Sequence, residues 1–151
     1  MIDALERALV VGRSLQVGTA VVFVDLDGFK EVNDPFGHTI GDQLLAHAAA
    51  LLRRGTRPGD IIGCLGGDEF LIVLTDVEGV EVVRERVEQL IEHLVTPLEV
   101  VAGVPIRIRA STGIAWTSDE YLPADALIAA ADRAMYNSKH TGACEPVFVA
   151  V

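Results

Sequence analysis

Cysteine is scarce in this sequence, and long hydrophobic runs are absent. The 151 residues include only two cysteines, Cys64 and Cys144, too few for a disulfide framework or a four-ligand zinc site. No stretch approaches the roughly 18 consecutive apolar residues that a membrane-spanning helix needs. The first residues also lack the basic segment of a secretory signal peptide. These absences predict a cytoplasmic protein without a membrane span.

Positive charge is scarce as well. Lysine and arginine together number 12 against 22 aspartates and glutamates, which gives a net charge of −10. Nucleic-acid polymers and anionic membranes attract positive surfaces, so we expect neither of them as a partner. A single nucleotide is still possible, because one small site can hold a metal ion or a few local positive charges.

Composition and hydrophobic periodicity indicate one globular domain over residues 1–151. Half of the residues are apolar and 23% are charged, and no linker or internal repeat divides the chain. Helices are predicted over residues 2–10, 42–54, 80–94 and 123–139. Strands are predicted over residues 19–26, 61–65, 70–74, 98–102, 105–116 and 146–151. Intermixed strands and helices favour an α/β (α+β) fold, with one mixed sheet covered by helices.

Some residues set the expected boundaries and faces of these elements. Gly55 is expected to cap the second helix, and Pro97 is expected to end the third. Arg84 and Arg86 are expected on the polar face of the third helix. The two glycines at 66–67 predict a hairpin turn between neighbouring strands.

Two pairs of acidic residues stand at predicted strand ends. Asp25 and Asp27 follow a buried strand, and Asp68 and Glu69 follow the glycines of the hairpin. A buried carboxylate is costly unless a positive group meets it. On neighbouring strands, these pairs can converge on a hard cation such as Mg²⁺, which takes oxygen ligands and often substrate phosphates. The alternative is that both segments are ordinary turns.

Lys30, Asn33 and Asp42 flank the first acidic pair. The Lys30 ammonium suits a phosphate, while the Asn33 amide and the Asp42 carboxylate suit the edge of a purine base. The alternative interpretation is structural. In that case Lys30 is a solvated helix residue, residues 33–35 form a turn, and Asp42 caps the next helix.

Four segments carry a resemblance to a known family. They are residues 25–34 (DLDGFKEVND), 36–42 (FGHTIGD), 65–70 (LGGDEF) and 131–139 (ADRAMYNSK). In this order and spacing they resemble the GGDEF domain of diguanylate cyclases, over nearly the whole chain. The resemblance implies a mainly antiparallel central sheet, like that of nucleotide cyclases and polymerase palms. It also implies a homodimer that condenses two GTP molecules into cyclic di-GMP, with release of two pyrophosphates.

The resemblance also assigns roles to individual residues. Asp25, Asp68 and the backbone carbonyl of Leu26 match the family's ligands for Mg²⁺ or Mn²⁺, and Glu69 matches a residue that supports the metal or accepts the 3′-hydroxyl proton. Asp68, Glu69 and Lys30 are therefore the expected catalytic residues. The positions expected to bind GTP are Phe29, Lys30, Asn33, His38, Asp42, Gly66, Gly67 and Lys139.

Arg57 and Asp60 form a second candidate site. They precede the hairpin and match the family's RxxD motif, where cyclic di-GMP binds and halts turnover. An arginine offers bidentate contacts to phosphate and can stack on guanine. The structural alternative is an exposed arginine in a Pro-Gly turn. The alternative function is a non-catalytic cyclic di-GMP receptor or GTP-binding regulatory module that acts through these two residues.

Departures from the family pattern predict slow turnover. Cys64 stands where the family has an arginine, and Ala143 stands where it has another. Neither residue can supply positive charge near a phosphate. The family's opening segment has no counterpart, because this chain starts at about where that segment ends. Cys64 and Cys144 are expected to be buried or half-buried, and a rival role for Cys64 is therefore packing in the core.

Overall fold

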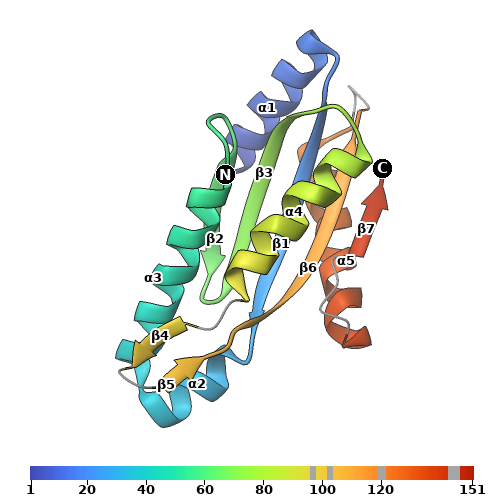
Figure 1. Cartoon of the computed structure of the whole chain (residues 1–151). Helices are drawn as coiled ribbons and strands as arrows, with labels where there is room; N and C mark the ends of the chain where they lie inside the picture. The colour runs from blue at the N-terminus through green and yellow to red at the C-terminus, as the bar shows by residue number, and fades with distance from the viewer. Residues whose placement is uncertain (96–97, 102–103, 119–121, 143–146) are drawn as a thin grey trace.

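A five-stranded sheet forms the centre of the molecule, and helices cover both of its faces (Figure 1). The computed structural model describes residues 1–95, 98–101, 104–118, 122–142 and 147–151. In chain order the elements are α1 (Ile2–Leu15), β1 (Gly18–Asp27), α2 (Phe29–Phe36), α3 (His38–Gly55), β2 (Ile61–Gly66), β3 (Glu69–Val77), α4 (Val80–Leu94), β4 (Leu98–Val101), β5 (Val104–Ile106), β6 (Arg109–Thr117), α5 (Ala124–Thr141) and β7 (Val147–Ala150).

The central sheet has the strand order β2-β3-β1-β6-β7. The pairs β2–β3, β3–β1 and β1–β6 are antiparallel, and β7 runs parallel to β6. β4 and β5 form a separate two-stranded sheet. The predicted mixed, mainly antiparallel central sheet covered by helices is therefore confirmed.

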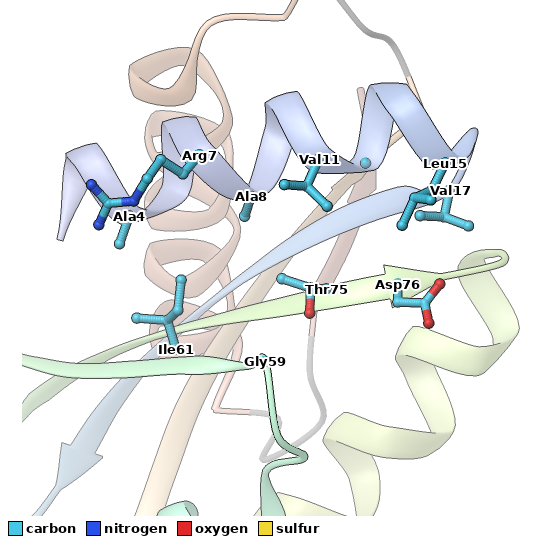
Figure 2. Close-up of a pocket in the computed structure, with 11 residues that line it drawn as sticks. Ala4, Arg7, Ala8, Val11, Leu15, Val17, Gly59, Ile61, Thr75 and Asp76 are labelled. Atoms are coloured by element: carbon cyan, nitrogen blue, oxygen red, sulfur yellow. The ribbon is translucent and has the colours of Figure 1, made fainter.

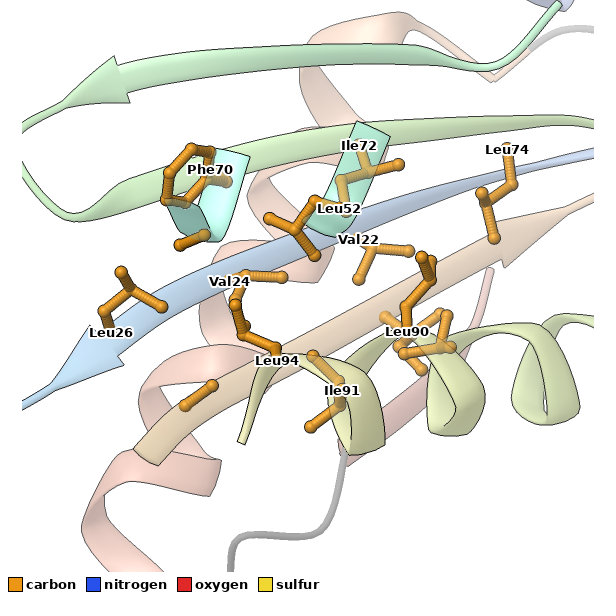
Figure 3. Packing of buried hydrophobic residues seen from close by; sticks show 14 of the residues in the cluster. Val22, Val24, Leu26, Leu52, Phe70, Ile72, Leu74, Leu90, Ile91 and Leu94 are labelled. Atoms are coloured by element: carbon orange, nitrogen blue, oxygen red, sulfur yellow. The ribbon is translucent and has the colours of Figure 1, made fainter. Parts of the chain in front are cut away.

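β1 lies in the middle of the sheet and is buried on both faces, as its run of β-branched residues predicts. Side chains alternate along a strand, so Val22 and Val24 pack with α3 and α4 on one face (Figure 3). Val21 and Phe23 pack with α1 and α5 on the other face. This two-sided packing holds β1 firmly, and its last residues carry the first acidic pair.

Helix α5 packs closely against β6. A Cβ atom at Gly113 would stand 2.1 Å from both the carbonyl oxygen of Ala131 and the amide nitrogen of Met135. Only a residue without a side chain permits this contact. It sets the height of α5 above the sheet, and it thereby places Lys139, one turn beyond Met135, over the end of β1.

Most predicted boundaries are close to those observed, but α1 runs to Leu15, five residues beyond the predicted end at residue 10, and three other predictions differ. The predicted strand 105–116 is two strands, because the chain leaves the small sheet after β5 and enters the central sheet at β6. Residues 33–35 lie inside α2 and do not form a turn. Helix α3 begins at His38, so Asp42 lies in its second turn and does not cap it.

Two predictions about caps have different outcomes. Gly55 is the last residue of α3, and Thr56 provides the C-cap, so the expected role of Gly55 is wrong. Helix α4 ends at Leu94, and Pro97 lies outside the described residues.

Two predictions about exposure are wrong. The side chain of Arg86 is 9% exposed, because it turns inward to Asp60 instead of joining the polar face of α4. Cys64 is exposed, because β2 is an edge strand whose last three residues are uncovered. Cys144 lies outside the described residues. Across the described ranges, no helix combines the length and the apolar character needed to cross a bilayer.

Candidate active site

The end of β1 collects polar side chains from three strands and one helix. Asp25 pairs in register with Glu69 on β3 and with Ser111 on β6. The Nζ atom of Lys139, on α5, lies 2.7 Å from Oδ2 of Asp25. Asp25 is only 6% exposed. This ion pair therefore neutralises a carboxylate that the sheet holds inside the protein.

The β2–β3 hairpin brings Asp68 to the same end of the sheet. The backbone N–H of Leu26 donates a hydrogen bond to the carbonyl oxygen of Asp68, with an N···O distance of 3.0 Å. Gly67 has a φ of 54°, a conformation that side chains disfavour, so a glycine there permits the tight turn. Glu69 follows as the first residue of β3. Asp25, Asp68 and Glu69 are thus gathered at one end of the sheet.

Burial and neighbouring charges raise the pKa values of Asp25 and Glu69. Burial raises the pKa of Asp25 above its ordinary value; Lys139 opposes that rise, and the charge of Asp68 adds to it. Burial and the charges of Asp25 and Asp68 also raise the pKa of Glu69. The hydrogen bond to Asp25 raises the pKa of Lys139, which stays positive. A cation would therefore relieve repulsion within this cluster.

The donor set fits a hard divalent cation that binds together with a phosphate group. Carboxylate oxygens are the ligands that Mg²⁺ and Mn²⁺ prefer. Within the described ranges, however, no three acidic, histidine or cysteine side chains are grouped closely enough to hold a metal ion by themselves. Oxygen atoms from a nucleotide, from water or from the backbone would have to complete the coordination. Mg²⁺ commonly keeps such ligands.

The side-chain amide of Asn33 lies where α2 meets α3, and its oxygen is a hydrogen-bond acceptor. A Cβ atom at Gly41 would lie 1.8 Å from Oδ1 of Asn33, so the absence of a side chain at Gly41 makes room for the amide. Oδ1 of Asn33 is buried and has no hydrogen-bond partner among the described residues. Asp42 is the next residue along α3 and is exposed. Two acceptors placed in this way suit the N–H groups of a guanine edge.

The remaining predicted GTP-binding residues lie on α2, at the start of α3 and in the β2–β3 hairpin. Lys30 and His38 are exposed, and Phe29 is half-buried against the core cluster. Gly66 and Gly67 are exposed in the hairpin, where an added Cβ atom would meet nothing within 4 Å. The space above the hairpin is therefore open to a phosphate group.

Known proteins share this arrangement. Residues 1–144 match the family described as "Diguanylate cyclase, GGDEF domain". The chain belongs to the GGDEF diguanylate cyclase family.

Two curated relatives of this GGDEF domain are diguanylate cyclases by name. The chain is 37% identical over 140 residues to the bifunctional diguanylate cyclase/cyclic di-GMP phosphodiesterase MucR of Pseudomonas aeruginosa, a match that covers 93% of this chain and 20% of MucR. It is 38% identical over 139 residues to the diguanylate cyclase DgcP of Escherichia coli, covering 91% of this chain and 40% of DgcP. The chain thus spans less than half the length of either relative.

Solved structures confirm the GGDEF fold. The GGDEF domain of TpbB (YfiN) from Pseudomonas aeruginosa superposes with a TM-score of 0.90 at 30% identity, over 99% of this chain and 92% of that chain. The GGDEF domain of DgcB from Caulobacter crescentus, solved in complex with c-di-GMP, superposes with a TM-score of 0.86 at 26% identity, over 97% of this chain and 86% of that chain.

In this GGDEF domain Asp60 is an interior carboxylate with several partners. Its side chain is 1% exposed. One oxygen accepts the backbone N–H of Arg57 at 2.7 Å and the guanidinium of Arg86, and the other accepts the backbone N–H of Thr75 at 3.1 Å. Arg57 itself is exposed. The carboxylate therefore shapes the turn that presents Arg57, and its own oxygens are occupied.

Some residues beside Asp25 and Asp60 could not be predicted from the sequence. Oγ of Ser111 donates a 2.6 Å hydrogen bond to Oδ2 of Asp27, whose Oδ1 lies 4.0 Å from Nζ of Lys139. Ser111 and Asp27 are 84 positions apart, and they meet because the register of β1 and β6 places Ser111 opposite Asp25 and so diagonally across from Asp27. Gly41 was recoverable, because it stands directly before Asp42 in a family motif. The pairing of Arg86 with Asp60 had no sequence signal.

Proposed function

We propose that this domain condenses two GTP molecules into cyclic di-GMP and two pyrophosphates, with Mg²⁺ or Mn²⁺ as cofactor. The observation that supports this best is the grouping of Asp25, Asp68 and Glu69 at one end of the sheet, with Lys139 beside them. Phosphoryl transfer requires positioning and charge neutralisation more than covalent chemistry from the protein. The residues at this corner offer both.

In this proposal each group has a distinct task. A bound divalent cation would neutralise phosphate oxygens and polarise the phosphoryl group. Asp25, Asp68 and the carbonyl of Leu26 would hold it, and Glu69 would support the site or accept the proton of the 3′-hydroxyl. Lys30 and Lys139 would supply positive charge to the phosphates.

Base selection is proposed for the corner between α2 and α3. The unpaired Oδ1 of Asn33 and the exposed carboxylate of Asp42 would accept hydrogen bonds from guanine. Guanine presents N1–H and N2–H donors side by side, whereas adenine presents only one amino group on that edge. Adenine would therefore leave at least one of these acceptors unpaired, and a buried polar group without a partner is costly. GTP should therefore bind much more tightly than ATP.

The two linkages of cyclic di-GMP determine how many subunits must meet. Cyclic di-GMP has two equivalent linkages, and one site holding one GTP cannot form both. Two subunits are therefore proposed to face each other, so that each 3′-hydroxyl attacks the α-phosphate held by the partner. Turnover is proposed to be slow, because Cys64 cannot provide the positive charge that an arginine would add beside the hairpin.

A GTP turnover assay with product analysis tests this proposal. The parent protein should convert GTP to cyclic di-GMP only with Mg²⁺ or Mn²⁺, and the rate per subunit should rise with protein concentration. Asp68→Asn should abolish conversion, whereas Asp3→Asn, an exposed site on α1, should leave it unchanged. Unchanged conversion in Asp68→Asn would refute the assignment of the site. Equal competition by ATP and GTP would refute base selection by Asn33 and Asp42.

The exposure of Arg57 supports a second proposal, namely that cyclic di-GMP binds at Arg57 and regulates the domain. The buried Asp60 would hold the turn, and Arg57 would contact phosphate or stack on guanine. Without turnover, this site would make the domain a cyclic di-GMP receptor or a GTP-binding regulatory module. Calorimetric titration should show that Arg57→Ala loses most affinity for cyclic di-GMP, and that Arg54→Ala, also exposed nearby, does not. Equal affinity in the two variants would contradict this role.

A further inference from the structure

Asp27 is the member of the two acidic pairs that has no task in the proposed function. It is the last residue of β1, two positions beyond Asp25 and on the same face of the sheet, because side chains alternate along a strand. Its Oδ2 accepts the 2.6 Å hydrogen bond from Oγ of Ser111, and its Oδ1 lies 4.0 Å from Nζ of Lys139. Ser111 therefore fixes one oxygen of this carboxylate and leaves the other beside the lysine.

The ammonium of Lys139 would compete with a divalent cation for Asp25. Nζ of Lys139 lies 2.7 Å from Oδ2 of Asp25. A cation on the same carboxylate would repel this ammonium strongly, because the carboxylate is buried and water screens the two positive charges only in part. Lys139 would then have to leave Asp25, and the cost of that move depends on whether its ammonium meets another counter-charge.

We propose that Asp27 is a positioning residue that receives the Lys139 ammonium when a divalent cation and GTP bind at Asp25. This inference rests on the proposed function. A small rotation of the lysine side chain brings Nζ from Oδ2 of Asp25 to Oδ1 of Asp27, which is already 4.0 Å away. Paired with Asp27, the ammonium keeps a fixed place beside the phosphates.

The exposure of the three side chains favours this exchange. The side chain of Asp25 is 9% exposed, that of Asp27 is 30% exposed and that of Lys139 is 48% exposed. The move therefore takes the ammonium outward, from an interior carboxylate to a more exposed one, and towards the space where phosphates would bind. Ser111 is buried in β6, so its hydroxyl holds Asp27 at the rim of the site.

The alternative is that Asp27 binds the cation directly. The pairing of β1 with β3 ends at Asp25 and Glu69, and Leu26 bonds to the backbone of Asp68. Asp27 lies further along β1, at about 7 Å from Asp25 for two residues of an extended strand. It is therefore further from the other acidic residues than Asp25 is. The two roles differ in a measurable way, because only the positioning role depends on Lys139.

Calorimetric titration with the Mn²⁺ complex of α,β-methylene GTP tests the proposal. This analogue cannot release pyrophosphate, so binding is measured without turnover. Asp27→Asn should weaken binding roughly threefold to tenfold, because the displaced ammonium loses its counter-charge. The same substitution should have little effect in a Lys139→Met background, where no ammonium has to move. Ser111→Ala, which changes no charge, should cause a smaller loss that also depends on Lys139.

Two other aspartates serve as controls for the loss of one negative charge. Asp132 is exposed on α5, and its charge acts on Glu69. Asp76 is exposed near the other end of β3, where it lines an apolar groove beside α1 (Figure 2). Asp132→Asn and Asp76→Asn should each change the affinity by less than about twofold, because water and salt screen their charges. The change should be the same with and without Lys139→Met.

The sign of the effect and its dependence on Lys139 decide the outcome. An equal loss from Asp27→Asn in both backgrounds would mean that Asp27 binds the cation or only supports the strand, and it would overturn the proposal. Tighter binding in Asp27→Asn would also overturn it, because Asp27 would then hold Lys139 only in the free protein. A parent protein that does not bind the Mn²⁺ complex would refute the proposed function as well, whereas binding without this dependence refutes the positioning role alone.

A crystal structure of the parent protein with Mn²⁺ and the same analogue gives a direct second measurement. Nζ of Lys139 should lie closer to Oδ1 of Asp27 than to Oδ2 of Asp25, with the hydrogen bond from Ser111 to Asp27 intact. Nζ still bonded to Asp25 beside the bound cation would overturn the exchange.

Discussion

Asp25 and Asp60 are both buried carboxylates with a basic partner, yet their surroundings differ. Asp25 meets Lys139, whose side chain is 48% exposed. Asp60 meets Arg86, whose side chain is 9% exposed, and it also accepts two backbone N–H groups. Lysine is a flexible point charge, whereas the planar guanidinium of arginine holds its partner in a fixed geometry.

Because of this difference, the carboxylate of Asp25 can change its partner, whereas the carboxylate of Asp60 cannot. The ammonium of Lys139 can move into solvent, so a cation or a phosphate can enter beside Asp25 at low cost. The carboxylate of Asp60 joins the start of β2 to β3 and α4, and no other described group could replace Arg86 there without movement of α4. The first corner is suited to binding, and the second maintains the fold.

The largest expected effect follows from removal of the interior carboxylate. Asp60→Ala would leave Arg86 buried without a counter-charge, and loss of one partner of a buried pair costs about 3–5 kcal/mol. Urea denaturation should show this loss, whereas Glu85→Ala, exposed on α4, should change the free energy of unfolding little. In the double variant Asp60→Ala, Arg86→Met, part of the stability should return. A loss below about 1 kcal/mol in Asp60→Ala would contradict a structural role.

The next effect concerns β2, which begins beside Asp60 and ends at the hairpin. Cys64 is exposed there, with its Sγ 3.8 Å from the carbonyl oxygen of Gly67, so an arginine has room. A charged contact felt only in the transition state is worth about 1.5–3 kcal/mol, so Cys64→Arg should raise turnover roughly tenfold to a hundredfold. Its melting temperature should stay near that of the parent. Cys64→Ser, which adds no charge, is the control. An unchanged rate in Cys64→Arg would show that the cysteine has no catalytic consequence.

A smaller effect is expected at the hydrogen bond that supports Asp27. Ser111 is 3% exposed, and its hydroxyl donates to a carboxylate whose side chain is 30% exposed. Water can replace part of that bond, so Ser111→Ala should lower the free energy of unfolding by about 1–2 kcal/mol. Chemical denaturation alongside Ser118→Ala, an exposed position, measures the difference. Equal stability of the two variants would mean that Asp27 does not need this donor.

The smallest effect should be a gain in stability. The pKa of Asp25 is raised in the folded protein, so the folded state holds this proton at pH values where the unfolded chain has lost it. The free energy of unfolding therefore falls as pH rises from the ordinary pKa through the raised one, and it stays lower above that range. Asn cannot ionise, and Lys139 is half-exposed and tolerates the loss of its partner.

Asp25→Asn should thus melt at a slightly higher temperature than the parent at pH 7 and without nucleotide. The difference should vanish below the ordinary pKa of an aspartate, and GTP turnover should be lost. Asp3→Asn, at an exposed position, should show no such pH-dependent difference. A lower melting temperature for Asp25→Asn at pH 7 would show that the ion pair with Lys139 outweighs burial and repulsion.

The sequence by itself determined the class of fold and most of the elements, and it predicted the chemistry of the candidate site. Carboxylates after a buried strand, two glycines at a hairpin and an amide with a nearby aspartate are local patterns, so β1, the β2–β3 hairpin and α4 could be predicted from them. Local patterns could not show that Asn33 lies inside a helix, because α2 is stabilised by its contacts with α3.

Only the tertiary structure decided which charged groups meet. Lys139 and Asp25 are 114 positions apart, and they meet because the contact at Gly113 sets the height of α5 above the sheet. The register of β1 and β6 places Ser111 beside Asp27, and the packing of α4 turns Arg86 inward to Asp60. Periodicity places a side chain on the face of an element, but its partner depends on register and on the distance between packed elements. Tertiary packing therefore gives Asp25 a half-exposed partner that can leave, and it gives Asp60 a buried partner that holds the fold.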